Sequence, residues 1–177
     1  MKLTARERRN DMIRLLQKQK ETPISGSQLA SHFSVSRQVV VQDMSLLKAG
    51  GHPVLATSQG YVWRGTPNNR QYERIVVCKH HPEESEKELT LLVDHGITVK
   101  DVMIEHPVYG ELTGQLMVKS RKDVERFVSQ MKSAHASYLS ELTGGIHMHT
   151  LEADSENDFT AAVSALEEAG FLVTSDS

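Results

Sequence analysis

The stretch that decides the fold of the first half is SRQVVVQDMSLLKAG, residues 36–50. Ser36 is a good helix N-cap, and Gly50 is a typical helix end. Between them, three apolar residues recur at i, i+4 and i+7, as on the buried face of a helix: Val40, Met44 and Leu47. The stretch therefore predicts a capped helix that begins at Arg37 and stops at Gly50.

Two further helical patterns precede this helix. Residues 5–19, ARERRNDMIRLLQKQ, place apolar residues among basic ones, and Thr4 can cap their start. Residues 26–33, GSQLASHF, predict a short second helix. A short helix, a tight turn and a capped longer helix are typical of a helix-turn-helix.

A predicted hairpin follows the third helix. Its two β-like runs are PVLAT at residues 53–57 and YVWRG at residues 61–65, joined by Ser58-Gln59-Gly60. The hairpin would be the wing of a winged helix-turn-helix. We therefore expect a DNA-binding domain over residues 1–65.

The start of the third helix carries the candidate DNA contacts. They are the cap and the residues outside the core stripe: Ser36, Arg37, Gln38, Val41 and Gln42. A recognition helix meets base edges near this end. Arginine and glutamine can read guanine and adenine through paired hydrogen bonds, and a valine can touch a thymine methyl group. The alternative is that these side chains are ordinary solvated helix surface.

Charge is divided unevenly along the chain. Through Gly65 there are ten Lys and Arg against four Asp and Glu, a balance of +6, and the remainder has ten against nineteen, a balance of −9. A basic first half suits a polyanion such as DNA. The break in pattern from Gly65 to Asn69 predicts a linker at residues 66–72, followed by a second domain at residues 73–177.

Composition indicates a folded protein of the cytoplasm. No apolar run approaches the roughly 20 residues of a membrane-spanning helix, and the N-terminus lacks the pattern of a signal peptide. The single cysteine, Cys78, excludes an intrachain disulfide. We expect it to be a small hydrophobic residue in a strand.

Strand-like and helix-like segments alternate in the second half. Strands are predicted at residues 74–80, 98–106, 111–118, 145–153 and 171–175, and helices at 82–96, 120–134 and 155–170. This order predicts an α+β sandwich, similar in kind to ferredoxin-like domains, with helices on one face of a largely antiparallel sheet.

A pair of histidines in the fourth predicted strand stands out. His147 and His149 are two residues apart, so their side chains lie on the same face of the strand. His80 ends the first strand, and Glu88 lies in the helix that follows. Three imidazoles and a carboxylate would suit Zn, Ni, Fe or Mn. The alternatives are surface histidines and hydrogen-bonded core histidines.

Several blocks carry a family resemblance. KHHPEESEKEL, HPVYG and GGIHMHT resemble the three-histidine (3H) domain, and VSRQVVVQDMSLLKAGG with ATSQGYVW resembles the biotin-repressor-like winged helices of bacterial regulators. Their combination is similar to the NiaR-type repressors of NAD biosynthesis and nicotinate uptake. The resemblance spans essentially the whole chain.

The resemblance implies a ligand set and a corepressor. One divalent transition metal ion would be held by His80, Glu88, His147 and His149. Nicotinic acid would be the corepressor that tightens operator binding, with His106 in its pocket and Tyr109 near it. His81 adjoins His80 and is the alternative first ligand, but the family spacing to Glu88 favours His80.

The predicted function is therefore a homodimeric repressor, neither an enzyme nor a membrane protein, whose paired recognition helices read an inverted repeat in operator DNA. One alternative is a metal-sensing regulator, in which the ion itself is the signal. Another is a metallohydrolase acting on pyridine amides or esters, with Glu105 or Glu111 as general base. The predicted DNA-binding half argues against an enzyme.

Overall fold

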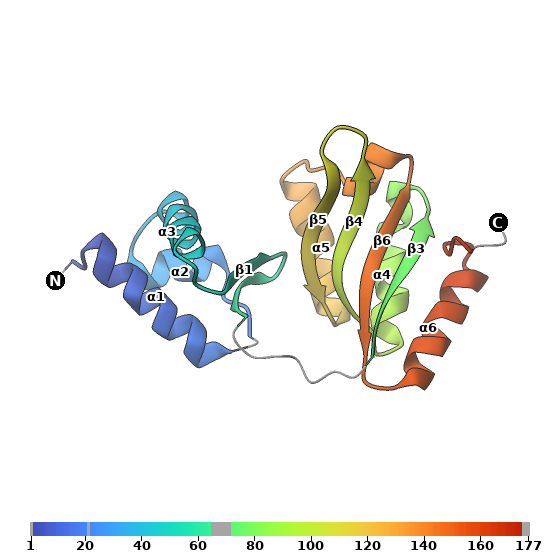
Figure 1. The fold of residues 1–177 in the computed structure, drawn as a ribbon, viewed down its shortest axis with the longest axis horizontal. Helices are drawn as coiled ribbons and strands as arrows, with labels where there is room; N and C mark the ends of the chain where they lie inside the picture. Colours follow the sequence, from blue (N-terminus) through green and yellow to red (C-terminus); the bar gives the residue numbers. More distant parts are fainter. Residues whose placement is uncertain (1, 21, 65–71, 175–177) are drawn as a thin grey trace. The chain divides into compact units, whose positions relative to one another are not determined.

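A computed structural model describes residues 2–20, 22–64 and 72–174 (Figure 1). The chain divides into two compact units, Met1–Asn68 and Asn69–Ser177. This boundary falls within the expected linker at residues 66–72, of which all but Tyr72 lies outside the described residues. Within the described part of the chain, no helix is long and apolar enough to cross a membrane.

The first unit is a winged helix-turn-helix, as the sequence predicts. Its elements are α1 (Ala5–Gln19), α2 (Gly26–Phe33), α3 (Arg37–Ala49), β1 (Val54–Thr57) and β2 (Gly60–Trp63). Each helix begins at a side chain that accepts a hydrogen bond from the first turn: Thr4, Ser25 and Ser36. These caps fix where the helices start.

The three helices and the wing share one small core. The predicted stripe of Val40, Met44 and Leu47 packs against residues of the other elements: Met12, Leu16, Leu29 and Val54. A partly buried ion pair also joins α1 to α3, because Arg8 Nε donates to Asp43 Oδ2 at 2.6 Å. The wing is attached through paired backbone hydrogen bonds between Ile24 and Tyr61, at 2.8 and 3.0 Å.

The second unit is an antiparallel sheet with helices packed on it. The strands are β3 (Tyr72–Lys79), β4 (Thr98–His106), β5 (Gly110–Val118) and β6 (Ile146–Ala153), and the helices are α4 (Ser85–Asp94), α5 (Arg121–Ser133) and α6 (Glu156–Glu168). Two short 3-10 helices, η1 (Pro82–Glu84) and η2 (Leu139–Thr143), precede α4 and β6. The strand order is β3-β6-β4-β5, and every neighbouring pair is antiparallel.

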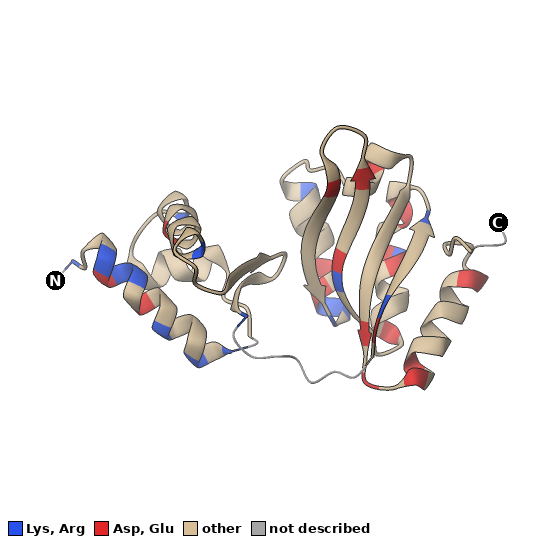
Figure 2. Ribbon diagram, viewed as in Figure 1, with Lys and Arg blue, Asp and Glu red and all other residues tan. Residues whose placement is uncertain are grey.

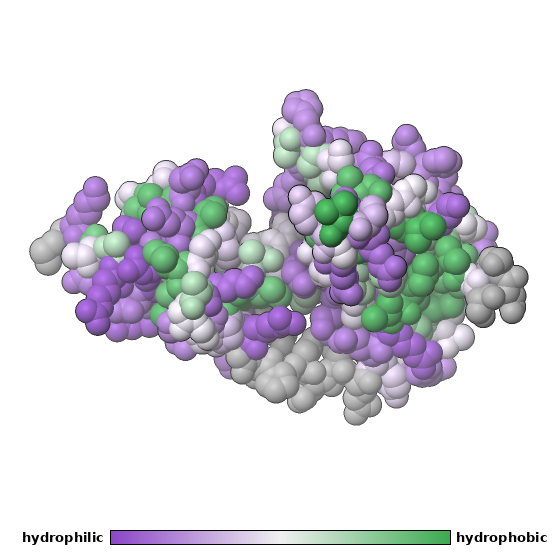
Figure 3. Space-filling view, turned by 45° about the horizontal axis from the view of Figure 1, so that its top comes forward, coloured by the Kyte–Doolittle hydropathy of each residue, from purple (hydrophilic) through white to green (hydrophobic). Residues whose placement is uncertain are grey.

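One face of this sheet carries the core. Helix α4 contacts both α5 and α6, and α4 and α5 lie behind the sheet in Figure 1. The packed core includes Leu92, Val99, Val118, Leu151 and Leu166. The opposite face carries two exposed apolar side chains, Ile75 on the edge strand β3 and Ile146 at the start of the neighbouring strand β6. Apolar side chains reach the surface of this unit in Figure 3.

Two segments of the second unit differ from the sequence prediction. Of the strand expected at residues 171–175, residue 175 lies outside the described residues, and residues 171–174 form a single bridge, between Leu172 and Cys78. The apolar run instead turns Phe171 into the core, where it is 3% exposed. The short helix η2 was not predicted, because its five residues carry no helical periodicity.

Candidate metal centre

Four side chains that the sequence singles out meet on the helix-covered face of the sheet. His147 and His149 lie on β6, His80 directly follows β3, and Glu88 lies in the first turn of α4. The Glu88 carboxylate oxygens lie 3.0 Å from Nε2 of His147 and 2.5 Å from Nε2 of His149. Glu88 also pairs with Nε2 of His80. All four residues are buried.

Strand register explains this convergence. In the β3–β6 pair, Cys78 lies opposite His147 and Val76 lies opposite His149. Side chains of residues two apart share a face, so His80 and His149 lie diagonally on either side of the central Cys78–His147 pair. The 3-10 turn η1 then starts α4 directly after β3, which brings its first turn over the same face.

Backbone carbonyls fix the orientation of all three rings. Each Nδ1 lies 2.7 or 2.8 Å from a backbone carbonyl oxygen; the pairs are His80 with His81, His147 with Gly145, and His149 with Asp101. A carbonyl oxygen can only accept, so each Nδ1 carries a proton. Nε2 of each ring therefore faces Glu88: when it carries a proton it donates to the carboxylate, and without the proton it offers a lone pair to a metal ion. Metal-bound imidazoles are held in the same way, through the nitrogen that does not bind the ion.

The carbonyl that holds His147 belongs to a constrained glycine. Gly145 has a φ of +96°, and a Cβ at this position would lie 2.5 Å from the carbonyl oxygen of His80. Only glycine allows the two backbones to approach so closely in this conformation. The glycine thus lets β6 start beside the end of β3, where two of the rings meet.

The carbonyl that holds His149 comes from a β-bulge. The pairing of β4 with β6 shifts register between Val99 and Met103. Within this bulge the carbonyl oxygen of Asp101 lies 2.7 Å from Nδ1 of His149, and its side-chain Oδ1 accepts from the backbone N–H of Thr150 at 2.8 Å. The bulge therefore turns one residue of β4 toward the cluster.

Charge within the cluster determines the protonation of Glu88. Burial alone would raise the pKa of this carboxyl group, but the three imidazoles outweigh burial and lower the pKa well below its ordinary value. For His80 and His149, burial acts to lower the pKa, and the Glu88 carboxylate outweighs it, so both pKa values are raised. Glu88 is therefore an anion surrounded by three nitrogen donors.

This donor set fits a divalent transition metal ion. Three imidazole nitrogens and one carboxylate are typical ligands of Zn and of other first-row ions, and alone they do not select one of them. Glu88 contacts all three rings, so the four side chains meet around one carboxylate. Their role as metal ligands stays a prediction.

A cavity of about 160 Å³ opens beside the cluster. Glu88, His147 and His149 form one part of its lining. Apolar side chains form much of the rest: Leu89, Val102, Leu116, Phe127, Met131 and Leu139. Gly114 and four polar residues complete the lining: Ser85, Ser137, Tyr138 and Ser140. An apolar slot with a few convergent polar groups at one end is typical of a site for a small organic ligand.

Each unit matches a described family. Residues 8–62 match the HTH domain, and residues 73–175 match the 3H domain. The chain is 51% identical over 167 residues to the transcription repressor NadR of Bacillus subtilis (strain 168), covering 93% of each protein. It is 42% identical over 173 residues to the probable transcription repressor NiaR of Thermotoga maritima, covering 98% of this chain and 97% of that protein. The chain belongs to the NiaR/NadR family of transcription repressors.

Membership in the NiaR/NadR family decides between two classes of protein that the sequence left open, a transcription repressor and an enzyme. Both relatives are named transcription repressors, and both are matched over nearly their full length. The chain is therefore a DNA-binding repressor and not an enzyme, as the sequence predicts. The metallohydrolase alternative is not supported.

The predicted DNA contacts of this NiaR/NadR-type repressor lie at the start and on the outer face of α3. All five are exposed, and Val41 is 52% exposed. Ser36 Oγ accepts from the backbone N–H of Val39 at 3.2 Å, so its observed role is the helix cap. Arg37 extends beside the start of α2, where a Cβ on Gly26 would lie 3.5 Å from its Nε. Lys and Arg also follow α1 in Figure 2. DNA contact by the five residues stays a prediction.

The predicted nicotinate-binding residues are not brought to the cavity. His106 and Tyr109 lie at the turn between β4 and β5, where Nδ1 of His106 accepts from the backbone N–H groups of Val108 and Tyr109, each at 3.1 Å. Tyr109 is 76% exposed, and neither residue lines the cavity beside the cluster. Within one chain the observed role of His106 is to stabilise the turn, and a role of either residue in ligand binding stays a prediction.

The alternative first ligand is placed differently from His80. The side chain of His81 is exposed, and its backbone carbonyl orients the ring of His80. It is the ring of His80 that reaches Glu88. The position of the His80 ring thus agrees with the family spacing, which favours His80 over His81.

Sequence reasoning missed one residue of the cluster, Cys78. It is fully buried, and its Sγ, a Glu88 oxygen and a His147 nitrogen all lie within 4.8 Å of one another. Burial, and then the charge of Glu88, raises the pKa of this thiol. A signal was available, because Cys78 precedes His80 by two residues in the same strand and so shares its face.

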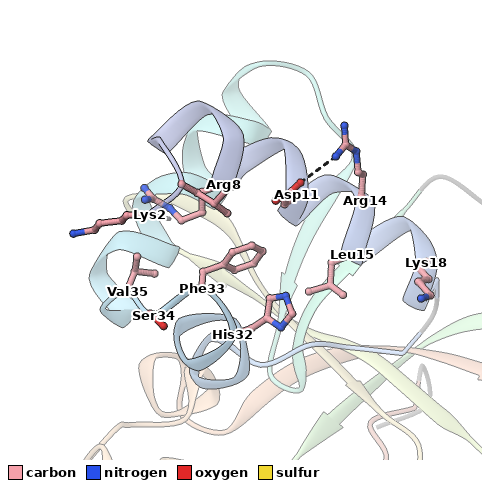
Figure 4. A pocket seen from close by; sticks show the side chains of 11 residues that line it. Lys2, Arg8, Asp11, Arg14, Leu15, Lys18, His32, Phe33, Ser34 and Val35 are labelled. Carbon is pink, nitrogen blue, oxygen red and sulfur yellow. Dashed lines mark hydrogen bonds and ion pairs between the residues drawn. The ribbon is translucent and has the colours of Figure 1, made fainter.

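A second cavity lies in the first unit, between α1 and the end of α2 (Figure 4). Its volume is about 660 Å³, and Leu15, His32 and Phe33 contribute to its lining. Asp11 and Arg14, which also line it, form an ion pair at 3.1 Å. The predicted DNA contacts and metal ligands do not line this cavity.

Proposed function

We propose that this repressor contains one divalent transition metal ion per chain and uses nicotinic acid as its corepressor, to control genes of NAD biosynthesis and nicotinate uptake. The ion would be held by His80, Glu88, His147 and His149. The observation that carries the proposal is the orientation of three Nε2 atoms toward Glu88, beside an apolar cavity of about 160 Å³. When bound, the ion supplies a positive charge that a ligand carboxylate can approach.

The cavity supports a flat heteroaromatic acid as the ligand. Phe127 and Leu116 offer apolar walls on which a pyridine ring can pack, and Glu88, His147 and His149 line the same cavity. In this arrangement the carboxylate of nicotinic acid points toward His147 and His149, and the ring fills the apolar slot.

Corepression requires that nicotinate bind the DNA-competent arrangement of the repressor more tightly than the other arrangements. A tenfold preference corresponds to about 1.4 kcal/mol. By linkage, operator DNA must then tighten nicotinate binding by the same factor. A single additional contact to the ligand carboxylate in the favoured arrangement is large enough for this effect.

We also propose that the repressor acts in the cytoplasm as a homodimer on an inverted repeat. Two recognition helices of a dimer read half-sites about 34–36 Å apart, or a multiple of this distance. The exposed Ile75 and Ile146, on the sheet face opposite to the helices, support a second copy of the chain as the partner.

Calorimetric titration tests the corepressor proposal directly. Nicotinate should bind the purified protein, should fail to bind after chelation, and should bind again when the ion is restored. Binding that survives complete chelation would contradict a role of the metal in the ligand site. If DNA binding followed free metal and ignored nicotinate, the metal-sensing regulator would replace the corepressor proposal.

Replacing Arg37 by alanine is expected to weaken specific DNA binding by about 1–3 kcal/mol, the usual cost of losing one base-reading side chain. The measurement is an electrophoretic shift titration with a promoter fragment that the wild-type protein retards. Lys48→Ala is the matched control, because Lys48 is exposed in the last turn of the same helix. Equal losses for both variants would argue against base recognition by Arg37.

Replacing Gly114 by valine is expected to weaken nicotinate binding at least about tenfold, or 1.4 kcal/mol, without loss of metal. Gly114 lines the cavity from β5, and an added Cβ would contact Val102 and Leu139 at 3.4 Å, so the side chain occupies space that the ligand needs. Thr113→Val, on the opposite face of the same strand, is the control. Unchanged calorimetric affinity in Gly114→Val would place the ligand elsewhere.

A further inference from the structure

We infer that Cys78 is an additional ligand of the metal centre and that its thiolate restricts the centre to ions with an affinity for sulfur. The inference depends on the proposed metal site, since it concerns the same ion. It adds a sulfur donor to three nitrogens and one carboxylate, and this changes which metal ions the repressor holds.

The place of Cys78 in the sheet is the first argument. It lies directly opposite His147 in the β3–β6 ladder, with its side chain on the face that carries all three imidazoles. His80 and His149 lie on either side of this central pair, and Glu88 approaches from α4. Cys78 therefore stands in the middle of the constellation.

Distance is the second argument. The Sγ of Cys78, an oxygen of Glu88 and a ring nitrogen of His147 all lie within 4.8 Å of one another. Zinc binds sulfur at about 2.3 Å and nitrogen at about 2.0–2.1 Å, so two such ligands on opposite sides of one ion lie up to about 4.4 Å apart. Shifts of a few tenths of an ångström bring these three atoms into one coordination sphere.

Surroundings are the third argument. Cys78 has no exposed surface; it belongs to the apolar core of this unit, and on the same face of the sheet it also lies beside the imidazole of His147 and the carboxylate of Glu88. A cation bound beside the thiol would deprotonate it on coordination. Binding then forms one metal–sulfur bond, breaks the S–H bond, and releases the proton to solvent.

The consequence is a narrower choice of metal. Carboxylate and imidazole alone suit Zn, Ni, Fe and Mn, whereas a thiolate favours zinc and the other sulfur-binding ions over manganese and magnesium. Cys78 thus supplies the selectivity that the other four ligands lack.

Cobalt(II) substitution tests the inference. The full-length protein is stripped by chelation and titrated with Co(II), which adopts the sites of zinc and gives an intense near-ultraviolet charge-transfer band when bound to thiolate. Because Cys78 is the single cysteine of the chain, any such band in the wild-type protein reports this residue. We expect the band to saturate at one ion per chain and to be lost in Cys78→Ser and Cys78→Ala, while both variants still take up cobalt.

Metal competition gives the second readout. In Cys78→Ser, we expect zinc affinity to fall about 100-fold. Removing a residue that only hydrogen-bonds a zinc ligand can already lower metal affinity by about this factor, and Cys78 is proposed to bind the ion directly. Manganese affinity should change much less. Stoichiometric cobalt without a thiolate band in the wild-type protein would overturn the role of Cys78 and leave the proposed metal site intact. A wild-type protein that takes up no cobalt, zinc or nickel would overturn the metal site itself.

Discussion

Replacing both His147 and His149 by alanine is expected to abolish stoichiometric metal in the purified repressor. The two rings provide half of the predicted nitrogen and carboxylate donors, and both contact Glu88 in the folded protein. Losing even an outer partner of a ligand costs about 10- to 100-fold in metal affinity, so losing two direct ligands should cost at least about 10⁴-fold. Elemental analysis after gel filtration and a competitive zinc titration measure the effect.

Neighbouring histidines provide the controls for this experiment. His80→Ala should lose metal as the double variant does, whereas His81→Ala should retain it, because its exposed side chain does not belong to the cluster. His95→Ala should also retain metal, since His95 hydrogen-bonds the carbonyl oxygen of Leu91 at the end of α4. Full metal content in the double variant, or loss in His81→Ala, would show that other residues hold the ion.

Replacing Gly145 by alanine should have the largest effect on stability. Its φ of +96° strains any residue with a Cβ, and that Cβ would lie 2.5 Å from the carbonyl oxygen of His80. Backbone strain of this kind costs about 1–3 kcal/mol, and the contact must also push β6 away from the end of β3. We expect the free energy of unfolding of the second unit to fall by about 3 kcal/mol or more. Metal binding should fall with it, because Gly145 orients His147.

Gly144→Ala is the matched control for this position. Gly144 also has a positive φ, +65°, but it is left-handed helical and a Cβ there meets nothing within 4 Å. The expected cost is about 1–2 kcal/mol. Urea denaturation of the metal-free proteins, followed by circular dichroism, separates stability from metal loss. The fluorescence of Trp63, the single tryptophan, follows the first unit and should be unchanged. Equal losses of unfolding free energy in Gly144→Ala and Gly145→Ala would contradict a cost from the close approach of Gly145 to the carbonyl of His80.

Local sequence signals were sufficient for the first unit. Its caps, its apolar spacing and its wing turn are short-range features, and the three helices begin at Thr4, Ser25 and Ser36 or directly after them. The pairing of His147 with His149 also follows from strand alternation alone. His80 and Glu88 joined the candidates because one ends a predicted strand and the other lies in the helix that follows, and the resemblance to the 3H domain then implied the same four residues as the ligand set.

Long-range features of the cluster could not be predicted. The carbonyl of Asp101 is available to His149 only because of a register shift between two strands that are far apart in the sequence. The cavity walls come from α4, β4, β5, α5 and η2, and the last of these has no helical pattern. His106 was expected near the ligand because of its motif, but the same motif also forms a tight turn, and the turn is what the ring stabilises in one chain.

The bulge in β4 makes the orientation of His149 depend on one extra residue in this strand. Removing one residue between Val99 and Met103 would restore a continuous ladder with β6 and leave the flanking side chains on their present faces, because β4 has one residue more than β6 across the bulge. Ile104, now 1% exposed, would stay in the core, but the backbone oxygen of Asp101 would no longer be turned toward His149. When homologous proteins are aligned, a one-residue gap at the bulge therefore marks a chain that can keep its sheet and yet lack this contact.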